Sequence, residues 1–155
     1  MAIAVRVRKL LDDNGIKYLH TVHSPAYTAS EVAQAAHIKG RAFAKTVVIR
    51  TPKGGFALVV VSANDLVSLE ALGKEMGAEA PRLATEAEFE RLFPGIAVGA
   101  MSPFGNLYDL PVYVDRSVAE QKEIAFNAGT HRDVVQMAYA DFERLAKPKV
   151  GAFVE

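Results

Sequence analysis

The sequence predicts an α/β fold in which a mixed β-sheet is surrounded by helices. Two observations support this class. Helix-like and strand-like segments are mixed along the 155 residues rather than strictly alternating. A β-branched run that ends at Val47, Val48 and Ile49 precedes the turn-forming segment 51–55, and a second strand-like run follows the turn at 56–62. Together these segments predict an antiparallel hairpin. The length fits a single domain over residues 1–155 with a core of its own.

The helices are predicted from apolar periodicity and from capping signals. A hydroxyl followed three residues later by a carboxylate marks a helix start at Thr28 and again at Thr85. Gly15 and Gly77 each follow an apolar helical pattern and can adopt the left-handed conformation that ends a helix. The expected helices lie at 3–11, 29–36, 66–76, 86–93 and 141–146.

The strands are predicted from short apolar or β-branched runs that turn residues interrupt. Besides the hairpin, they are expected at 16–22, 96–99, 110–114, 123–127 and 134–139. A short charged helix or turn should separate the strands at 110–114 and 123–127. Residues 128–132 should form a loop.

Composition excludes several functional classes. Half of the residues are hydrophobic, and 18 basic residues balance 18 acidic ones, so broad charge-driven binding to nucleic acid is not expected and any such contact must be local and weak. The chain has no cysteine, which rules out disulfides, thiolate metal sites and thiol nucleophiles. It has no signal-peptide pattern at its start and no run of eighteen apolar residues, so a cytoplasmic protein without membrane contact is expected.

Lys45 is the unusual residue of the hairpin. In an extended strand its side chain shares a face with Phe43, Val47 and Ile49. An ammonium among apolar side chains loses hydration, which lowers its pKa unless an anion meets it. Such a lysine has a functional partner, or it lies at the strand entry and extends its charge to water. The pattern alone leaves both interpretations open.

Familiar catalytic and metal-binding patterns do not occur. His20 and His23 would point to opposite faces of a strand, and no carboxylate stands at ligand spacing from His37 or His131, so no metal site is expected. The chain contains no Gly-x-Ser-x-Gly sequence, no Walker loop and no Gly-x-Gly-x-x-Gly sequence. A hydrolase triad or a nucleotide cofactor therefore has no support.

Two glycine-containing loops are further candidates. In the segment 99–105, Gly99 and Gly105 permit close backbone approach while Pro103 restricts its neighbours, so the loop could present rigid main-chain groups to a ligand. The segment 127–129 has a similar composition. Both segments are equally compatible with ordinary tight turns.

The order of these motifs resembles the YbaK-like aminoacyl-tRNA deacylases, the family of the editing domain of bacterial prolyl-tRNA synthetase. The resemblance covers nearly the whole chain. It rests on Ala44-Lys45-Thr46-Val47-Val48, on Gly99-Ala-Met-Ser-Pro103 as the Gly-x-x-x-Pro loop, on Phe104-Gly105 and on the segment 123–129. No synthetase catalytic or anticodon-binding segment is present, so the chain is similar to the free-standing members.

This resemblance implies a partly barrel-like mixed sheet and a metal-independent enzyme without a cofactor. The enzyme would hydrolyse the ester that joins a wrong small amino acid to the 3′ end of a tRNA, with tRNA for proline as the expected substrate. It would contact the acceptor end weakly, and prolyl-tRNA synthetase or an elongation factor would help to set specificity. An aminoacyl ester is already activated, so such an enzyme mainly orients the ester and a water molecule.

The resemblance also assigns roles to residues. Lys45 would anchor the terminal phosphate or the reacting end, and Gly99 and Pro103 would form a rigid wall whose polar main-chain groups orient water or stabilise an oxyanion. Ser102 would donate a hydrogen bond, and the ribose 2′-OH would help to activate water. His131 either faces the pocket or is a surface loop histidine. The remaining substrate-binding candidates are His23, Tyr27, Thr46, Ala100, Met101, Phe104, Gly105, Asn127 and Gly129.

Three questions stay open at this level. The same fold could serve as a non-catalytic module that binds a tRNA end or a synthetase. A desolvated lysine could also form a Schiff base with a carbonyl substrate, which borohydride trapping would detect. The amino acid removed is undetermined among alanine, serine, threonine, cysteine and small non-protein amino acids, because one methylene is worth only about 1–3 kcal/mol of discrimination.

Overall fold

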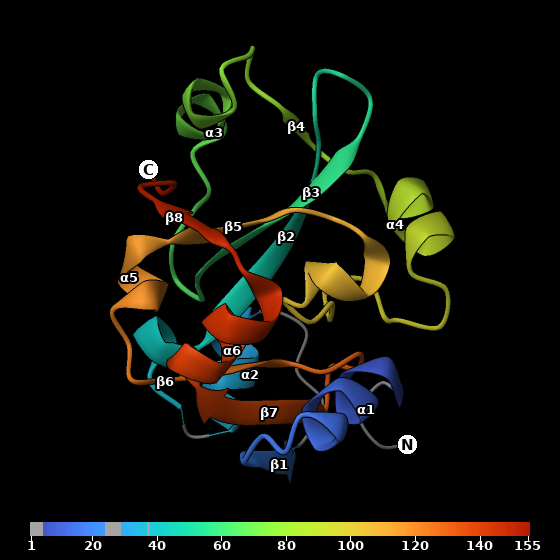
Figure 1. The fold of residues 1–155 in the computed structure, drawn as a ribbon, viewed down its shortest axis with the longest axis vertical. Coiled ribbons are helices and arrows are strands. Elements are labelled where there is room, and N and C mark those ends of the chain that lie inside the picture. Colours follow the sequence, from blue (N-terminus) through green and yellow to red (C-terminus); the bar gives the residue numbers. More distant parts are fainter. Residues whose placement is uncertain (1–4, 24–28, 37) are drawn as a thin grey trace.

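The computed structural model describes residues 5–23, 29–36 and 38–155 and contains two β-sheets with helices packed around them (Figure 1). A five-stranded sheet has the order β4-β2-β3-β5-β8, and a three-stranded antiparallel sheet has the order β1-β7-β6. In the larger sheet β3 runs antiparallel to β2 and parallel to β5, so the sheet is mixed as the sequence predicts. A parallel bridge between Phe43 and Ala125 joins the start of β2 to β6.

Helices and strands are interspersed along the whole chain. The helices and 3₁₀ turns are α1 (Val5–Asp13), α2 (Ala29–Ala35), η1 (Gly40–Ala42), α3 (Leu69–Met76), α4 (Glu86–Leu92), η2 (Gly105–Tyr108), α5 (Arg116–Ala119) and α6 (Tyr139–Ala146). The strands are β1 (Tyr18–Val22), β2 (Ala44–Arg50), β3 (Phe56–Ser62), β4 (Arg82–Leu83), β5 (Val112–Asp115), β6 (Glu123–Asn127), β7 (Asp133–Ala138) and β8 (Lys149–Gly151).

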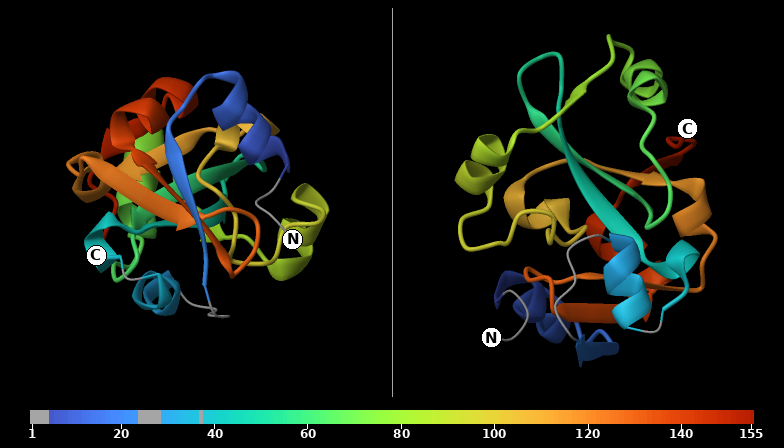
Figure 2. Two further views of the ribbon diagram at one scale, coloured as in Figure 1. Left: turned by 90° about the horizontal axis from the view of Figure 1, so that it is seen from below. Right: turned by 180° about the vertical axis from the view of Figure 1, so that it is seen from behind.

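The predicted hairpin is confirmed. Strands β2 and β3 pair along their whole length, with Lys45 opposite Val61 and Arg50 opposite Phe56. The amide of Thr51 donates to the carbonyl of Gly55 at 2.8 Å and closes the turn. The hairpin extends to the end of the molecule that lies opposite β1 and α1 (Figures 1 and 2).

The helix ends follow the capping signals in the sequence. Gly15 and Gly77 have φ of 64° and 65°, and each follows a helix as expected. The hydroxyl of Thr85 accepts from the amide of Glu88, whose carboxylate accepts from the amide of Thr85, so the capping box of α4 is confirmed. The corresponding signal at Thr28 lies outside the described residues.

Three hydrophobic clusters stabilise the fold. The largest lies between the sheets and includes Val48, Leu58, Phe104 and Phe126. The opposite face of the larger sheet packs against α3 and the C-terminal segment, and a third cluster fills the space under α2. None of the helices in the described ranges is long and apolar enough to span a membrane.

Several local predictions were wrong. Residues 96–99 form turns rather than a strand, because Gly99 adopts φ of 84°. The helix predicted at 66–76 begins at Leu69, because the hydroxyl of Ser68 accepts from the amide of Ala71 and caps the helix there. Leu66 therefore precedes α3, and it is 65% exposed. The short strands β4 and β8 were missed, since two or three residues carry no readable alternation. The sheet predicted as one is two sheets.

Gly105 shows that a glycine of a candidate loop can be required for packing alone. A Cβ atom at this position would lie 2.5 Å from the carbonyl oxygen of Leu110 and 2.6 Å from a methyl group of Val112. We therefore expect Gly105→Ala to lower the free energy of unfolding by about 1–3 kcal/mol, as overpacking does in other cores. Urea unfolding would measure the change.

Gly55→Ala is the matched control. Its Cβ would meet only the Thr51 hydroxyl oxygen at 3.4 Å, in an exposed turn. We expect a stability within about 0.5 kcal/mol of wild type for this variant. Equal losses in the two variants would contradict the packing explanation for Gly105.

Candidate functional site

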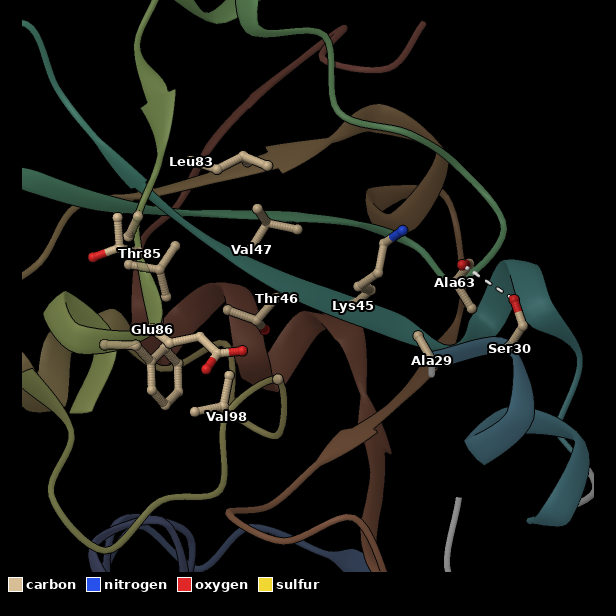
Figure 3. A pocket seen from close by; sticks show the side chains of 14 residues that line it. Ala29, Ser30, Lys45, Thr46, Val47, Ala63, Leu83, Thr85, Glu86 and Val98 are labelled. Carbon is tan, nitrogen blue, oxygen red and sulfur yellow. Dashed lines mark hydrogen bonds between the residues drawn. The ribbon is translucent and has the colours of Figure 1, made fainter. Parts of the chain in front are cut away.

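A cavity of about 410 Å³ opens along one edge of β2 (Figure 3). The four consecutive residues Lys45, Thr46, Val47 and Val48 all line it. Side chains alternate between the two faces of a strand, so four consecutive residues can line one cavity only if the cavity lies beside the strand edge. The main chain of β2 therefore forms part of the cavity wall. A volume of this size is typical of sites for small molecules.

Lys45 provides the cationic group of the cavity. Its Nζ atom donates a hydrogen bond of 2.6 Å to the main-chain carbonyl of Asp65. Burial lowers the pKa of the Lys45 ammonium, and the negative charge of Asp65 partly opposes that effect. The side chain therefore lies half-buried in the cavity, and its charge is not fully extended to water.

Helix α2 and the turn after β3 form one side of the cavity. Ala29, Ser30 and Ala63 line this side. The Ser30 hydroxyl donates to Oδ1 of Asn64 at 2.5 Å. The same hydroxyl lies 3.4 Å from the carbonyl oxygen of Ala63 (Figure 3). These contacts hold the first turn of α2 against the segment that follows β3.

Strand β4 and helix α4 form the opposite side. They contribute Leu83 through Glu86, together with Phe89. The carboxylate of Glu88 attaches α4 to the sheet, because it accepts hydrogen bonds of 2.9 Å from Arg50 and Arg82 and one of 2.9 Å from the amide of Thr85. The hydrogen bonds from Arg82, and then those from Thr85, hold the pKa of Glu88 well below its usual range.

The Gly-x-x-x-Pro loop closes the cavity with Val98 and Gly99. The amide of Ala100 donates to the carbonyl of Ala97 at 2.9 Å, and Gly99 occupies the turn between them. Main-chain hydrogen bonds of 3.1 and 3.0 Å join Ala97 and Ala100 to Gly129. The loops at 97–100 and 127–131 are thereby held together.

His131 belongs to this pair of loops. Its Nε2 atom lies 2.8 Å from the carbonyl oxygen of Val98, and a Cβ atom on Gly99 would lie 3.5 Å from its ring. The ring thus packs against the turn that contains Gly99. The structure therefore brings Lys45, Thr46, Gly99 and His131 to the same region of the molecule.

The other predicted site residues lie elsewhere. Residues 100–105 are buried, and among them Ala100, Met101, Ser102 and Phe104 are at most 3% exposed. They do not line the cavity. The same is true of Asn127, Gly129 and His23, which are also buried, and His23 donates its amide to the carbonyl of Arg132. Tyr27 lies outside the described residues.

Sequence reasoning missed the wall made by β4 and α4. The capping box at Thr85 correctly predicted where α4 begins, but nothing in the local pattern shows which strand a helix packs beside. The two arginines that hold Glu88 come from segments 32 residues apart in sequence (82 − 50), so only the fold could reveal the cluster. Within the residues that the structure describes, no three His, Asp or Glu side chains are grouped so as to hold a metal ion.

A family model and a related protein point to the same family. The family model described as the aminoacyl-tRNA editing domain matches residues 23–145. The chain is 29% identical to the multifunctional Ser/Thr-tRNA deacylase ProXp-y of Escherichia coli (strain K12), over 96% of this chain and 90% of that protein.

Solved structures share the fold. A crystal structure proposed to be of a trans-editing enzyme for prolyl-tRNA synthetase is 27% identical, with a TM-score of 0.80 over 97% of this chain and 95% of that one. The hypothetical protein APE2540 has a TM-score of 0.86 over 97% of this chain and 99% of that one. Its identity of 19% supports a common fold alone.

The Glu88 cluster generates a pH-dependent prediction. The folded-state pKa of Glu88 is lower than the 4.5 of an unperturbed glutamate, so folding favours the charged form. The stability from this cluster is fully present above pH 4.5 and is lost as the pH falls through the folded-state pKa. We expect Glu88→Gln to lower the melting temperature at pH 7 and the difference from wild type to shrink below about pH 4.5.

Thermal unfolding followed by circular dichroism between about pH 3 and 7 would measure this. Glu90→Gln on the same helix is the control, since Glu90 is exposed and its substitution should leave the melting temperature near that of wild type at every pH. A difference between Glu88→Gln and wild type that stays constant with pH would contradict the assignment.

Proposed function

Since the chain belongs to the aminoacyl-tRNA editing domain family, the family that its motifs resemble, we propose that it removes mischarged small amino acids from tRNA through the cavity beside β2. The family is one of trans-editing aminoacyl-tRNA deacylases, so the chain is a hydrolase of that class. We propose that residues 1–155 form a single deacylase domain and that tRNA for proline is the substrate. The half-buried ammonium of Lys45 in an otherwise mainly apolar cavity carries this proposal.

The cavity fits a small aminoacyl ester. Its volume is at the small end of the range for ligand sites, and most of its lining consists of alanine, valine, leucine and phenylalanine. A cation in such surroundings attracts an anion more strongly than it would in water. Lys45 therefore suits the terminal phosphate of the tRNA or the charge that develops on the reacting ester.

The chemistry needs little beyond orientation. The oxygen of a water molecule attacks the ester carbonyl carbon, the bond from that carbon to the ribose oxygen breaks, and the ribose oxygen takes up a proton. The products are the free amino acid and the tRNA 3′ end. We propose that Lys45 holds the reacting end, that the ribose 2′-OH helps to activate the water, and that the turn at Gly99 restricts the size of the aminoacyl group.

The remaining residues support the cavity rather than contact the ester. Ser102, Pro103 and Asn127 are buried and do not line the cavity, and Nε2 of His131 contacts the Val98 carbonyl. The relative ProXp-y is named as a Ser/Thr-tRNA deacylase, and its match extends over 96% of this chain. The seryl and threonyl esters are therefore the first to test. We propose weak contact with the acceptor end and no metal in the reaction.

A deacylation panel tests the function. tRNA for proline is charged with alanine, serine, threonine, cysteine or proline and incubated with wild type, Lys45→Ala and Lys53→Ala. We expect wild type to clear at least one non-cognate ester and to spare prolyl-tRNA. Lys45→Ala should lose about 100-fold or more in kcat/KM, as expected for loss of a group that stabilises developing charge.

Lys53→Ala is the matched control, because Lys53 lies in the exposed turn of the same hairpin, away from the cavity, and should retain wild-type activity. Binding of tRNA or a synthetase without clearance of any ester would favour a non-catalytic module. Clearance that is unchanged in Lys45→Ala would remove this residue from the mechanism.

A further inference from the structure

The two edges of β2 differ in how they are paired. In an antiparallel pair, the main-chain groups of alternate residues point to the partner strand, and those of the residues between them point away. At the two ends of the hairpin, the Ala63 amide donates to the Phe43 carbonyl and the Thr51 amide donates to the Gly55 carbonyl. The N–H and C=O groups of the odd-numbered residues of β2 therefore point to β3. The Ala84 amide donates to the Val48 carbonyl on the opposite edge. Thr46 therefore directs both its N–H and its C=O away from β3.

Within the described residues, that second edge is covered at its two ends only. The bridge from Phe43 to Ala125 covers the start of β2, and β4 covers its end through Val48, Ile49 and Arg50. Between Phe43 and Val48, no strand in the described part of the chain pairs with this edge. Thr46 lies in the gap, and the cavity lies beside it.

We propose that this gap is the binding site for the main-chain atoms of the aminoacyl group, with the Thr46 C=O accepting from the α-ammonium and the Thr46 N–H donating to the ester carbonyl oxygen. An aminoacyl ester carries an amino group, a Cα atom and a carbonyl group in the order of one residue of a strand. It can therefore form with Thr46 the two hydrogen bonds that paired residues of antiparallel strands exchange. This inference rests on the proposed function.

The arrangement also explains how one cavity could accept several amino acids. The two hydrogen bonds involve only atoms that all α-amino acids share, and selection by size is left to apolar walls such as Val47 and Val98. During hydrolysis the ester carbonyl oxygen becomes negatively charged while water adds to the carbon. The Thr46 N–H then acts as a fixed donor to that oxygen, next to the ammonium of Lys45.

Substitution of Thr46 by proline tests the role of the Thr46 N–H as a hydrogen-bond donor. Proline lacks the N–H and is tolerated at strand edges where that group is unpaired. Because the Thr46 N–H points away from β3, Thr46→Pro removes no hydrogen bond of the hairpin. We expect kcat to fall about 10²–10³-fold, the usual effect of removing one oxyanion donor, with little change in melting temperature.

Two comparison variants separate this effect from others. Thr46→Val keeps both main-chain groups and the shape of the side chain, so its loss should be at least tenfold smaller than that of Thr46→Pro. Val22→Pro places proline on the outer edge of β1, a strand that contributes no residue to the cavity lining, and should leave kcat unchanged, since the Val22 amide also points away from its partner strand. Equal losses in Thr46→Pro and Thr46→Val would overturn the inference.

A change in the substrate tests whether the Thr46 C=O accepts from the α-ammonium. Deamination of alanyl-tRNA and seryl-tRNA gives the esters of lactic acid and glyceric acid, in which a hydroxyl of nearly the same size replaces the ammonium. We expect kcat/KM for these esters to be at least tenfold lower. The exposed carboxylate of Glu86 also lines the cavity, so the comparison is repeated in Glu86→Gln, where the preference for the ammonium should persist.

The outcomes distinguish this inference from the proposed function. If wild type clears no ester in the panel, the proposed function fails. If it clears esters but treats amino and hydroxy esters alike, or if the preference disappears in Glu86→Gln, the function stands and the role of the Thr46 main chain is overturned. Should Thr46→Pro fail to fold, the ester comparison decides alone.

Discussion

The pairing of β2 with β3 on one edge only is the constraint from which the site follows. A strand whose second edge is unpaired exposes polar main-chain groups, and such groups need water, another strand or a ligand. In this fold the Phe43–Ala125 bridge covers one end of that edge, and β4 covers the other. The cavity occupies the interval between them, so the same interruption of the sheet creates the space and supplies its polar wall.

The walls of this cavity are held by polar contacts that are themselves partly protected from water. Glu88 joins Arg50, Arg82 and the first turn of α4, so the position of α4 beside β2 depends on one carboxylate with several donors. On the other side the hydroxyl of Ser30 links α2 to the turn after β3. The loops at 97–100 and 129–131 are joined by main-chain hydrogen bonds. The shape of the cavity therefore depends on contacts among segments that are distant in sequence.

Lys45 illustrates the energetic compromise at the site. Burial disfavours its charged form, and the negative charge of Asp65 opposes this effect only in part, since the group that accepts from Nζ is the main-chain carbonyl of Asp65. A cation held in this way gains more from an arriving anion than a fully solvated lysine would. This is the physical reason for placing the reacting end of the substrate beside Lys45. In a chain with no net charge, the attraction for an anionic substrate then comes from this one local cation.

Much of the fold was determined by the sequence alone, because short-range physics governs it. The β2–β3 hairpin follows from β-branched runs around a turn, the ends of α1 and α3 from glycines with left-handed φ, and the start of α4 from its capping box. The motifs at Lys45 and Gly99 also indicated the family, and both residues line the cavity.

Only the tertiary structure decided which segments meet. The sequence could not show that residues 100–105 are buried outside the cavity lining, that α4 and β4 form a wall of the cavity, or that the strands divide into two sheets. Nor could it show that no strand in the described part of the chain pairs with the outer edge of β2 at Thr46, because a strand's own residues do not specify whether a second strand will pair with it. Those features depend on contacts between residues far apart in the chain, which local periodicity does not encode.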